Sequence, residues 1–273
     1  MEMYENIYNS LLKVKEKNPL VHHITNYVTV NDCANIVLAI GGSPVMADDE
    51  REVEEMVSIA SSLVINIGTL NSRTVQSMIL AGKKANSLNI PVILDPVGVG
   101  ATSYRTEVAK KLIEEVHFSV VRGNLSEIKN IAGIEVITKG VDASEVGDTS
   151  TKMEEKKEIS QELSKELDAI IAVTGEVDCI SSKDKSYYIA NGHKILSKIT
   201  GTGCMCSSLI GSFCGAERDY LTAAVAGVAS MGIAGEIAYE KTKDLGIGSF
   251  KTALMDSIYN LDLNTYKERS KIY

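Results

Sequence analysis

Two kinds of hydrophobic pattern alternate along the chain and predict alternating strands and helices. Continuous apolar runs of four or five residues are typical of strands that are buried on both faces. Such runs occupy residues 63–67, 90–94, 118–121 and 169–173. The segments between them are longer, and many of their apolar side chains recur every three or four residues, as on one face of a helix.

Four helices are predicted from this spacing. The first covers 49–61, with Asp48 or Asp49 as the expected N-cap, and the second begins after an expected N-cap at Asn71. The other two are marked by Val108, Leu112 and Val116, and by Ile159, Leu163 and Leu167. The last of these segments is otherwise highly charged, so its charges are expected to form a solvated face.

The carboxyl half of the chain is predicted to hold a hairpin, one more strand and several helices. The pattern over 177–190 predicts a hairpin that turns at 182–185, and residues 193–199 resemble a strand. At least three helical pieces are expected from Cys204 onward. The polar segment 140–152 is expected to be a loop.

One apolar segment, 221–239, is close to the length of a membrane span. It is rich in Ala and Gly, contains Glu236 and directly follows the charged residues 217–219. Because membrane spans are usually more strongly apolar than this, a tightly packed buried helix is favoured. We therefore expect no membrane partner.

Strands that alternate with helices indicate right-handed βαβ units. The predicted fold class is α/β, with a mostly parallel central sheet and helices on both of its faces. No linker, composition break or internal repeat divides the chain, so residues 1–273 are predicted to form a single domain. The sequence contains no Walker A lysine motif, which excludes a P-loop enzyme.

The composition of the chain indicates which binding partners and which cellular location to expect. The net charge is −8 and no block of Lys and Arg is present, so no nucleic-acid partner is expected. The five cysteines are odd in number and lack the paired spacing of a zinc site. No secretory leader is recognisable at the start of the sequence, and a reducing cytoplasm is the expected location.

The candidate chemistry lies where the predicted strands end. In an open parallel sheet, ligands bind beyond the carboxyl ends of the strands. The residues that follow the strands are Gly68-Thr69, Asp95-Pro96, Arg122-Gly123-Asn124, Thr174-Gly175 and Thr200-Gly201-Thr202-Gly203. A carboxylate, an arginine, hydroxyl groups and glycines that permit close approach therefore share one edge. This set suits a polyphosphate and a divalent cation.

The bend Gly201, Thr202 and Gly203 is the most informative of these segments. Its glycines let the main chain approach a ligand, and the helix that follows offers unpaired N–H groups and the positive end of its dipole. The bend therefore suits a phosphate or the negative charge that grows on one during transfer, and Cys204 is placed beside this anion hole.

Each candidate also has a purely structural interpretation. Asp95 before a proline is compatible with a simple turn, and Arg122 with a surface ion pair. Asn124 and Glu127 have the spacing of a capping box, although Glu127 also suits an indirect magnesium ligand. Thr174 is compatible with a cap. The adjacent His22 and His23 are expected to be structural, so we assign them no chemistry.

Several long motifs resemble the hydroxyethylthiazole kinase family, a ribokinase-like family of thiamine salvage. They run in the family's order over residues 19 to about 250, which is nearly the whole chain. The matching segments are 19–35 (PLVHHITNYVTVNDCAN), 41–47 (GGSPVMA), 94–102 (LDPVGVGAT), 122–128 (RGNLSEI), 173–178 (VTGEVD) and 200–204 (TGTGC).

The resemblance implies a three-layer ribokinase-like fold and an enzyme that uses ATP and Mg²⁺. Its expected reaction is phosphorylation of the hydroxyl of 4-methyl-5-(2-hydroxyethyl)thiazole. It also implies a homotrimer with substrate sites between subunits. It implies that Met46 and Gly201 contact the thiazole, with Asn26 nearby. It implies that Arg122 and Thr174 bind ATP. Asp95 and Glu127 are implied to interact with the metal and the phosphates.

Cys204 occupies the position at which most ribokinase-like enzymes carry an aspartate base. A helix N-terminus is expected to lower the pKa of this thiol, which predicts a weak base that also positions the alcohol. The alternative is that Cys204 only shapes the pocket. Met46 is suited to packing against a sulfur-containing aromatic ring, but also to an ordinary hydrophobic core. Asn26 is suited to a hydrogen bond with a ring nitrogen or with its own main chain.

Three rival functions remain at this point. They are a related kinase for a pyrimidine or pyridoxal alcohol, a dehydratase on the same scaffold that repairs nicotinamide cofactors, and a non-enzymatic ATP sensor. The first two normally carry aspartate at the position of Cys204. A sensor does not need an anion hole on the acceptor side, so the bend at 201–204 argues against the third.

Overall fold

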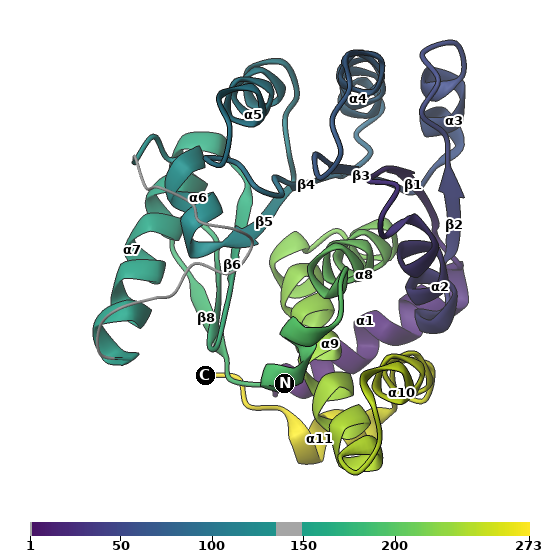
Figure 1. Cartoon of the computed structure of the whole chain (residues 1–273), viewed down its shortest axis with the longest axis vertical. Helices are drawn as coiled ribbons and strands as arrows, with labels where there is room; N and C mark the ends of the chain where they lie inside the picture. The colour runs from purple at the N-terminus through teal and green to yellow at the C-terminus, as the bar shows by residue number, and fades with distance from the viewer. Residues whose placement is uncertain (1, 135–148) are drawn as a thin grey trace.

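A computed structural model describes residues 2–134 and 149–273 of the chain, and Figure 1 shows the arrangement of its helices and strands. The strands form one sheet in the order β2-β1-β3-β4-β5-β6-β7-β8. Their bounds are β1 Leu20–Ile24, β2 Ser43–Met46, β3 Ser62–Asn66, β4 Val92–Asp95, β5 Val120–Asn124, β6 Ile170–Thr174, β7 Asp178–Ser181 and β8 Ser186–Ile189. The pairs from β2 to β6 are parallel, whereas β6–β7 and β7–β8 are antiparallel.

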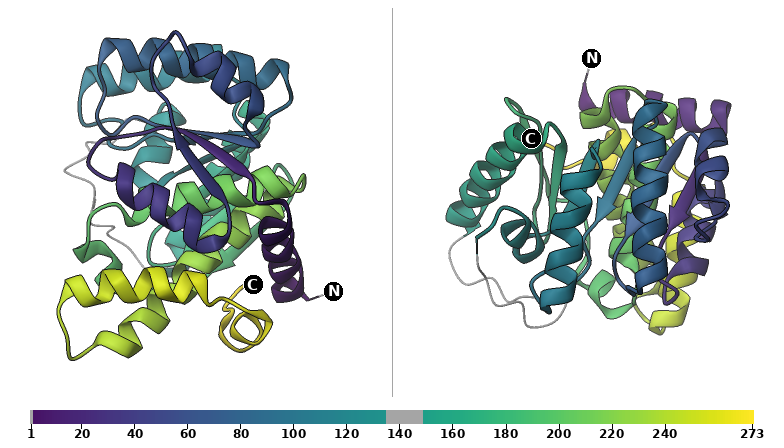
Figure 2. Two further views of the ribbon diagram at one scale, coloured as in Figure 1. Left: turned by 90° about the vertical axis from the view of Figure 1, so that its right-hand side faces the viewer. Right: turned by 90° about the horizontal axis from the view of Figure 1, so that it is seen from above.

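Helices cover both faces of this sheet. One face packs against α3 Val53–Ile59, α4 Ser72–Ser87, α5 Ser103–Glu115, α6 Leu125–Ile131 and α7 Thr149–Leu167. The other packs against α1 Met3–Lys17, α2 Val30–Ile40, α8 Thr202–Ala216, α9 Tyr220–Thr242, α10 Ile247–Tyr259 and α11 Leu263–Arg269. The further views agree with this layering (Figure 2). The predicted α/β class with a mostly parallel sheet between two helical layers is confirmed.

The core divides along the sheet because neighbouring side chains of a strand point to opposite faces. On β3, for example, Val64 belongs to the cluster under α8 and α9, whereas Leu63 and Ile65 belong to the cluster under α4. All five residues of β3 are buried, as expected for a strand covered on both faces. The continuous apolar runs in the sequence follow directly from this double burial.

The apolar helix predicted over 221–239 is α9, which spans Tyr220–Thr242. Within the described residues it is the one helix with the length and hydropathy of a membrane span, and 78% of its apolar window is buried inside the protein. It packs between α8, α10 and α1, as well as against β6, β7 and β8. Its many alanines and glycines are explained by this close packing on several sides.

Other predictions hold at the level of single features. Asn71 caps α4, and its side-chain oxygen accepts from Thr74 N at 3.0 Å. The hairpin turns where it was expected, since Ser182 N donates to the carbonyl of Lys185 between β7 and β8. From Cys204 onward the chain is helical. The described chain contains five free cysteines and no disulfide.

One predicted element was wrong and two differ in their bounds. Residues 193–199 are not a strand, because Lys194–Lys198 form the 3₁₀ helix η1, for which His193 Nδ1 accepts from Ile195 N. The first predicted helix is shorter, since Asp49 turns the chain by accepting from Arg51 N and α3 begins only at Val53. Of the loop expected at 140–152, residues 149–152 belong to α7, and residues 140–148 lie outside the described residues.

Candidate functional site

The polar residues predicted at the strand ends meet at one edge of the sheet. Asn66, the last residue of β3, lies opposite Asp95, the last residue of β4. Asn124 of β5 likewise lies opposite Thr174 of β6. The N-terminus of α8 points to the same edge, although η1 and not a strand leads into it. The sheet and one helix start together form the candidate site.

Tight main-chain packing defines the start of α8. Gly201 is its N-cap with φ of +88°, and a Cβ there would lie 2.7 Å from Thr29 Cγ2. A Cβ on Gly203 would lie 2.6 Å from Arg122 Nη1. Gly201 therefore requires glycine for its backbone conformation, and a side chain at Gly203 would displace the Arg122 guanidinium. The guanidinium of Arg122 rests directly against the first turn of the helix, where the N–H groups and helix dipole favour an anion.

Cys204 is held by two side-chain amides. Asn26 Nδ2 and Asn66 Nδ2 each lie 3.3 Å from Cys204 Sγ, and Asn26 Nδ2 also donates to Asn66 Oδ1 at 3.0 Å. Asn26 Oδ1 accepts from both the N–H and the hydroxyl of Thr29 at 3.0 Å. Asn26 thus contacts the thiol through its nitrogen and the nearby main chain at Thr29 through its oxygen.

The expected lowering of the Cys204 pKa was wrong. Burial and the nearby charge of Asp95 raise the pKa of this thiol, and the hydrogen bonds of Thr29 and Asn26 and the charge of Arg122 oppose the shift without cancelling it. Since a free thiol titrates above neutral pH, Cys204 is protonated at rest. The dipole of α8 does not outweigh the loss of solvent.

Asp95 is completely buried between the two halves of the site. Its Oδ2 accepts from Asn66 Nδ2 at 2.8 Å and from Ser207 Oγ at 2.9 Å. Its Oδ1 lies 3.6 Å from Arg122 Nη1 and has no hydrogen-bond partner among the described residues. Burial raises the pKa of Asp95, and the charge of Arg122 is the main influence that opposes this shift.

Arg122 carries the positive charge of the site. Its Nη2 donates to Thr174 Oγ1 at 2.6 Å, so the two residues implied for ATP contact each other across β5 and β6. Burial lowers the pKa of Arg122, but the attraction of Asp95 and other nearby groups outweighs burial and raises it. Arg122 therefore stays charged in the site, as an arginine does elsewhere in proteins.

Glu127 has the geometry of the capping box that its sequence spacing allowed. Its Oε2 accepts from Asn124 N, while Asn124 Oδ1 accepts from Glu127 N, each at 2.8 Å. Its Oε1 accepts from Gly98 N, also at 2.8 Å. Burial and the charge of Asp95 raise the pKa of Glu127. Both oxygens are thus engaged by main-chain N–H groups and hold the loop after β4 against α6.

The site offers few side chains that could hold a magnesium ion. Within residues 2–134 and 149–273, no group of three His, Cys, Asp or Glu side chains is arranged to hold a metal. A magnesium ion needs only one or two carboxylates, because it keeps several waters. Asp95 Oδ1, buried and without a hydrogen bond, fits such a ligand. Glu127 fits only through a water, since its oxygens are already engaged.

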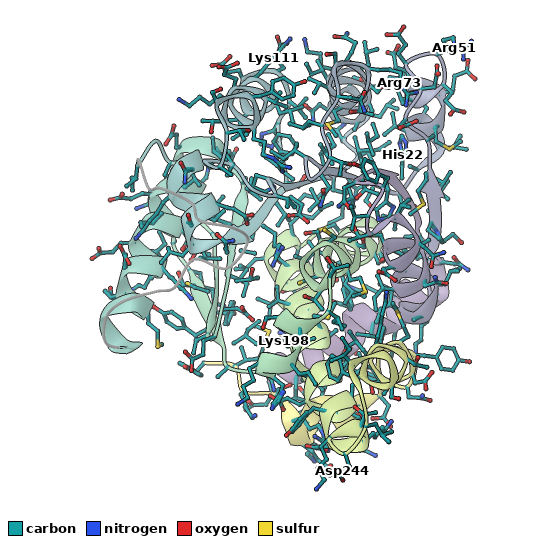
Figure 3. All side chains as sticks on the ribbon, in the orientation of Figure 1. His22, Arg51, Arg73, Lys111, Lys198 and Asp244 are labelled. Carbon is teal, nitrogen blue, oxygen red and sulfur yellow. The ribbon has the colours of Figure 1, made fainter. Side chains whose placement is uncertain are left out.

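The remaining predicted residues lie at the β1–β2 end of the sheet. Met46 ends the edge strand β2, pairs with His23 of β1 and is half-buried. His23 Nε2 and Ser208 Oγ are 3.0 Å apart, and burial lowers the pKa of His23 to about 4. His22 lies inside the molecule with Nε2 2.8 Å from the carbonyl of Ala47, whereas Arg51, Arg73 and Lys111 point outward (Figure 3). Both histidines have structural partners.

Two polar residues of the site were missed by the sequence analysis. Asn66 contacts Cys204 and Asp95, and Ser207 contacts Asp95. A polar side chain inside the apolar run 63–67 was the available signal for Asn66. Ser207 had no such signal, because serine is common throughout α8. A hollow of about 600 Å³ lies elsewhere, lined by residues of α1 and of 217–222, and does not touch these groups.

Comparison with known proteins decides the family. The sequence model of the "Hydroxyethylthiazole kinase family" matches residues 11–264. A protein of Clostridium tetani named hydroxyethylthiazole kinase is 66% identical over all of this chain and 99% of its own length. The chain belongs to the hydroxyethylthiazole kinase family. The resemblance stated from the motifs is confirmed.

Solved structures support the same conclusion for the fold. The structure of a hydroxyethylthiazole kinase protein from Pyrococcus horikoshii matches with a TM-score of 0.89 and 38% identity, over 98% of each chain. A pyridoxal kinase from Staphylococcus aureus in complex with ADP matches with a TM-score of 0.59 and 14% identity, over 80% of this chain and 88% of its own. The second likeness concerns the fold alone. The expected ribokinase-like fold is confirmed.

Proposed function

We propose that the chain, as a single domain over 1–273, transfers the terminal phosphate of ATP to the hydroxyl of 4-methyl-5-(2-hydroxyethyl)thiazole. Family membership supports this proposal. The observation that carries it is the meeting of Arg122, Gly203 and Thr174 on one side of Asp95 with Asn26, Asn66 and Cys204 on the other. In this proposal the product serves thiamine salvage in the cytoplasm.

The phosphate side of this arrangement is suited to charge stabilisation. Arg122 and the first N–H groups of α8, at Thr202 and Gly203, form an anion hole for the terminal phosphate, and Thr174 orients the guanidinium. Phosphoryl transfer depends mainly on positioning and on the neutralisation of charge, with little need for covalent help from the protein. A fixed arginine at a helix N-terminus supplies both.

The alcohol side is suited to orientation. Asn26 and Cys204 face the position of the hydroxyl, while Gly201 and Met46 contact the thiazole ring. Because the Cys204 thiol is protonated at rest, it orients the hydroxyl in that state and accepts the hydroxyl proton only in the small fraction that is ionised to the thiolate. The loose transition state of phosphoryl transfer tolerates such a weak base.

Magnesium is the proposed metal, with Asp95 Oδ1 as its protein ligand and Glu127 as a partner through water. A bound Mg²⁺ would neutralise charge on the phosphate oxygens and help to align them. Arg122 Nη1 lies 3.6 Å from the same Asp95 oxygen, so its charge would add to that of the ion in neutralising the phosphate.

The proposed assembly is a homotrimer with thiazole sites between subunits. Tyr27 and Val28 directly follow Asn26, and their exposed fractions are 79% and 56%. Large apolar side chains beside a polar site are suited to contact with a second subunit.

A coupled assay that follows ADP release over a panel of hydroxylated heterocycles tests the proposal. The expected result is the highest kcat/KM for the thiazole alcohol. Faster turnover of a pyrimidine or pyridoxal alcohol would replace the proposed substrate. Dehydration of a hydrated nicotinamide cofactor without phosphate transfer to any alcohol would replace the proposed reaction. ATP binding with neither reaction would indicate a sensor.

A further inference from the structure

Arg105 joins two main-chain segments of the candidate site without being part of it. It lies in the first turn of α5, and its guanidinium reaches the ends of two strands. Arg105 Nη1 donates to the carbonyl of Ile67 at 3.2 Å and to that of Val97, while Nη2 donates to the carbonyl of Gly68 at 2.8 Å. One rigid cation therefore holds the segments that follow β3 and β4.

The segment after β3 belongs to the alcohol side of the site. Ile67 and Gly68 come directly after Asn66, whose amide contacts Cys204 Sγ at 3.3 Å. Gly68 N also donates to Asn66 Oδ1 at 2.9 Å. A shift of the carbonyls at 67 and 68 would therefore move the amide that holds the thiol.

The segment after β4 belongs to the phosphate side. Val97 comes two residues after Asp95, and the next N–H, that of Gly98, donates to Glu127 Oε1 at 2.8 Å. Val97 N also donates to the carbonyl of Asp95 at 2.9 Å. A shift of the Val97 carbonyl would therefore move the carboxylates proposed to serve the metal and phosphates.

We infer that Arg105 is a positioning residue that sets the distance between the alcohol and the transferred phosphate. This inference rests on the proposed function. Arg105 Nη1 alone joins the two segments, and Nη2 adds a third carbonyl, that of Gly68. A lysine presents its donors from a single nitrogen on a flexible stem, so it does not reproduce this planar three-carbonyl arrangement. Because a displacement of about 1 Å can cost about 100-fold in rate, loosening one of these segments is expected to slow transfer without removing any group that binds a substrate.

Single-turnover kinetics with enzyme in excess tests this role in Arg105→Lys and Arg105→Ala. At enzyme concentrations that saturate the observed rate, the rate constant reports only folded, nucleotide-bound enzyme, whereas a loss of folded protein raises the enzyme concentration needed for saturation. We expect Arg105→Lys to lower the rate constant roughly 10- to 100-fold while the dissociation constant for ATP changes less than about threefold. Lys110→Ala, at an exposed position of the same helix, is the matched control and should leave the rate constant unchanged.

The outcomes separate this inference from the proposed function. A saturated rate constant of wild-type size in Arg105→Lys, whatever enzyme concentration reaches it, would show that Arg105 is merely structural and overturn the inference. Added guanidinium ion, kept well below denaturing concentrations, should restore part of the rate constant of Arg105→Ala if that variant folds. If the wild-type protein itself transfers no phosphate to the thiazole alcohol, the proposed function fails instead.

Discussion

The two sides of the candidate site use different chemistry. On the alcohol side, Asn26, Asn66 and Cys204 are joined by neutral amide and thiol hydrogen bonds. On the phosphate side, Arg122 brings a full positive charge against the first turn of α8. Asp95 lies between them and contacts both. The protein thus concentrates charge where the phosphate is expected and only orients the alcohol.

This contrast predicts where the rate enhancement comes from. A buried cation and a helix N-terminus act on charge as it develops, and their effect is strong because little water screens them. A neutral thiol with a raised pKa contributes less. Substitutions on the phosphate side should therefore reduce the rate more than substitutions on the alcohol side.

The largest effect is expected for Arg122→Ala. Loss of the guanidinium leaves Asp95 without its ion-pair partner and the phosphate without its side-chain cation. We expect kcat/KM for ATP to fall roughly 1000-fold, as for other arginines that stabilise phosphoryl transfer. Steady-state kinetics measures this change, and Arg73→Ala, on the exposed face of α4, is the control. A decrease in kcat/KM of less than tenfold would contradict the proposed difference between the phosphate side and the alcohol side.

A smaller effect is expected for Asn66→Ala. This change deletes the amide that contacts both Asp95 and Cys204, so both sides lose one hydrogen bond. We expect kcat to fall roughly 10- to 100-fold, because positioning is lost and the cation is kept. Asn86→Ala is a matched control, since its amide also makes two hydrogen bonds, but to His117 and far from the site. Equal kinetic losses in the two variants would contradict the role of Asn66.

Cys204 gives the sharpest test of the alcohol side. We expect Cys204→Asp to retain or raise turnover, because an ionised carboxylate can accept the hydroxyl proton directly, whereas the thiol at rest already carries its own proton. Cys204→Ser should lower kcat by about two- to tenfold, well below the usual contribution of a general base. Wild-type turnover in Cys204→Ser would exclude a base role. A loss of 1000-fold would show that the alcohol side carries as much of the rate as Arg122.

The smallest effect concerns Asp178 on the phosphate side, which accepts from Gly175 N at 2.8 Å beside Thr174. Burial raises the pKa of Asp178 from 3.8 to about 7, although this hydrogen bond and nearby cations oppose the shift. Between pH of about 4 and 7 the folded protein holds a proton that the unfolded chain has lost. The free energy of unfolding contributed by this group is therefore greatest below pH of about 4 and decreases as the pH rises to about 7.

Asp178→Asn should remove this pH dependence, because an amide does not titrate. The amide oxygen still accepts from Gly175 N, so the local structure is kept. Chemical denaturation over pH 4 to 8 is expected to show a flatter profile and, at pH 8, a gain of about 1 to 4 kcal/mol. Asp184→Asn, in the exposed hairpin turn, is the control. An unchanged profile in Asp178→Asn would mean that this carboxylate is ionised when the protein folds.

The sheet edge was predictable because its signals are local. Apolar runs gave the strands β3 to β6, and the polar residues at their ends fall at one edge in any parallel sheet. The strand ends were less exact. Arg122 and Thr174 lie within β5 and β6 instead of after them, since their main chains still pair across the sheet. The fold class and the meeting of Asp95, Arg122 and Thr174 could thus be inferred before any coordinates.

What could not be predicted depends on contacts between distant segments. The segment 193–199 has a strand-like composition, but the packing of Leu196 against α9 selects a 3₁₀ helix. The pKa of Cys204 depends on burial and on Asp95, 109 positions earlier in the sequence. The amides of Asn26 and Asn66 meet only because β1 and β3 are neighbours in the sheet. Spacing along one sequence does not contain these facts.

The most direct test is a crystal structure with a non-hydrolysable ATP analogue and the thiazole alcohol bound together. The account predicts the terminal phosphate between Arg122 and the N–H groups at the start of α8, with the hydroxyl of the alcohol beside Cys204 and in line with that phosphate. A terminal phosphate bound away from Arg122 and α8 would contradict it.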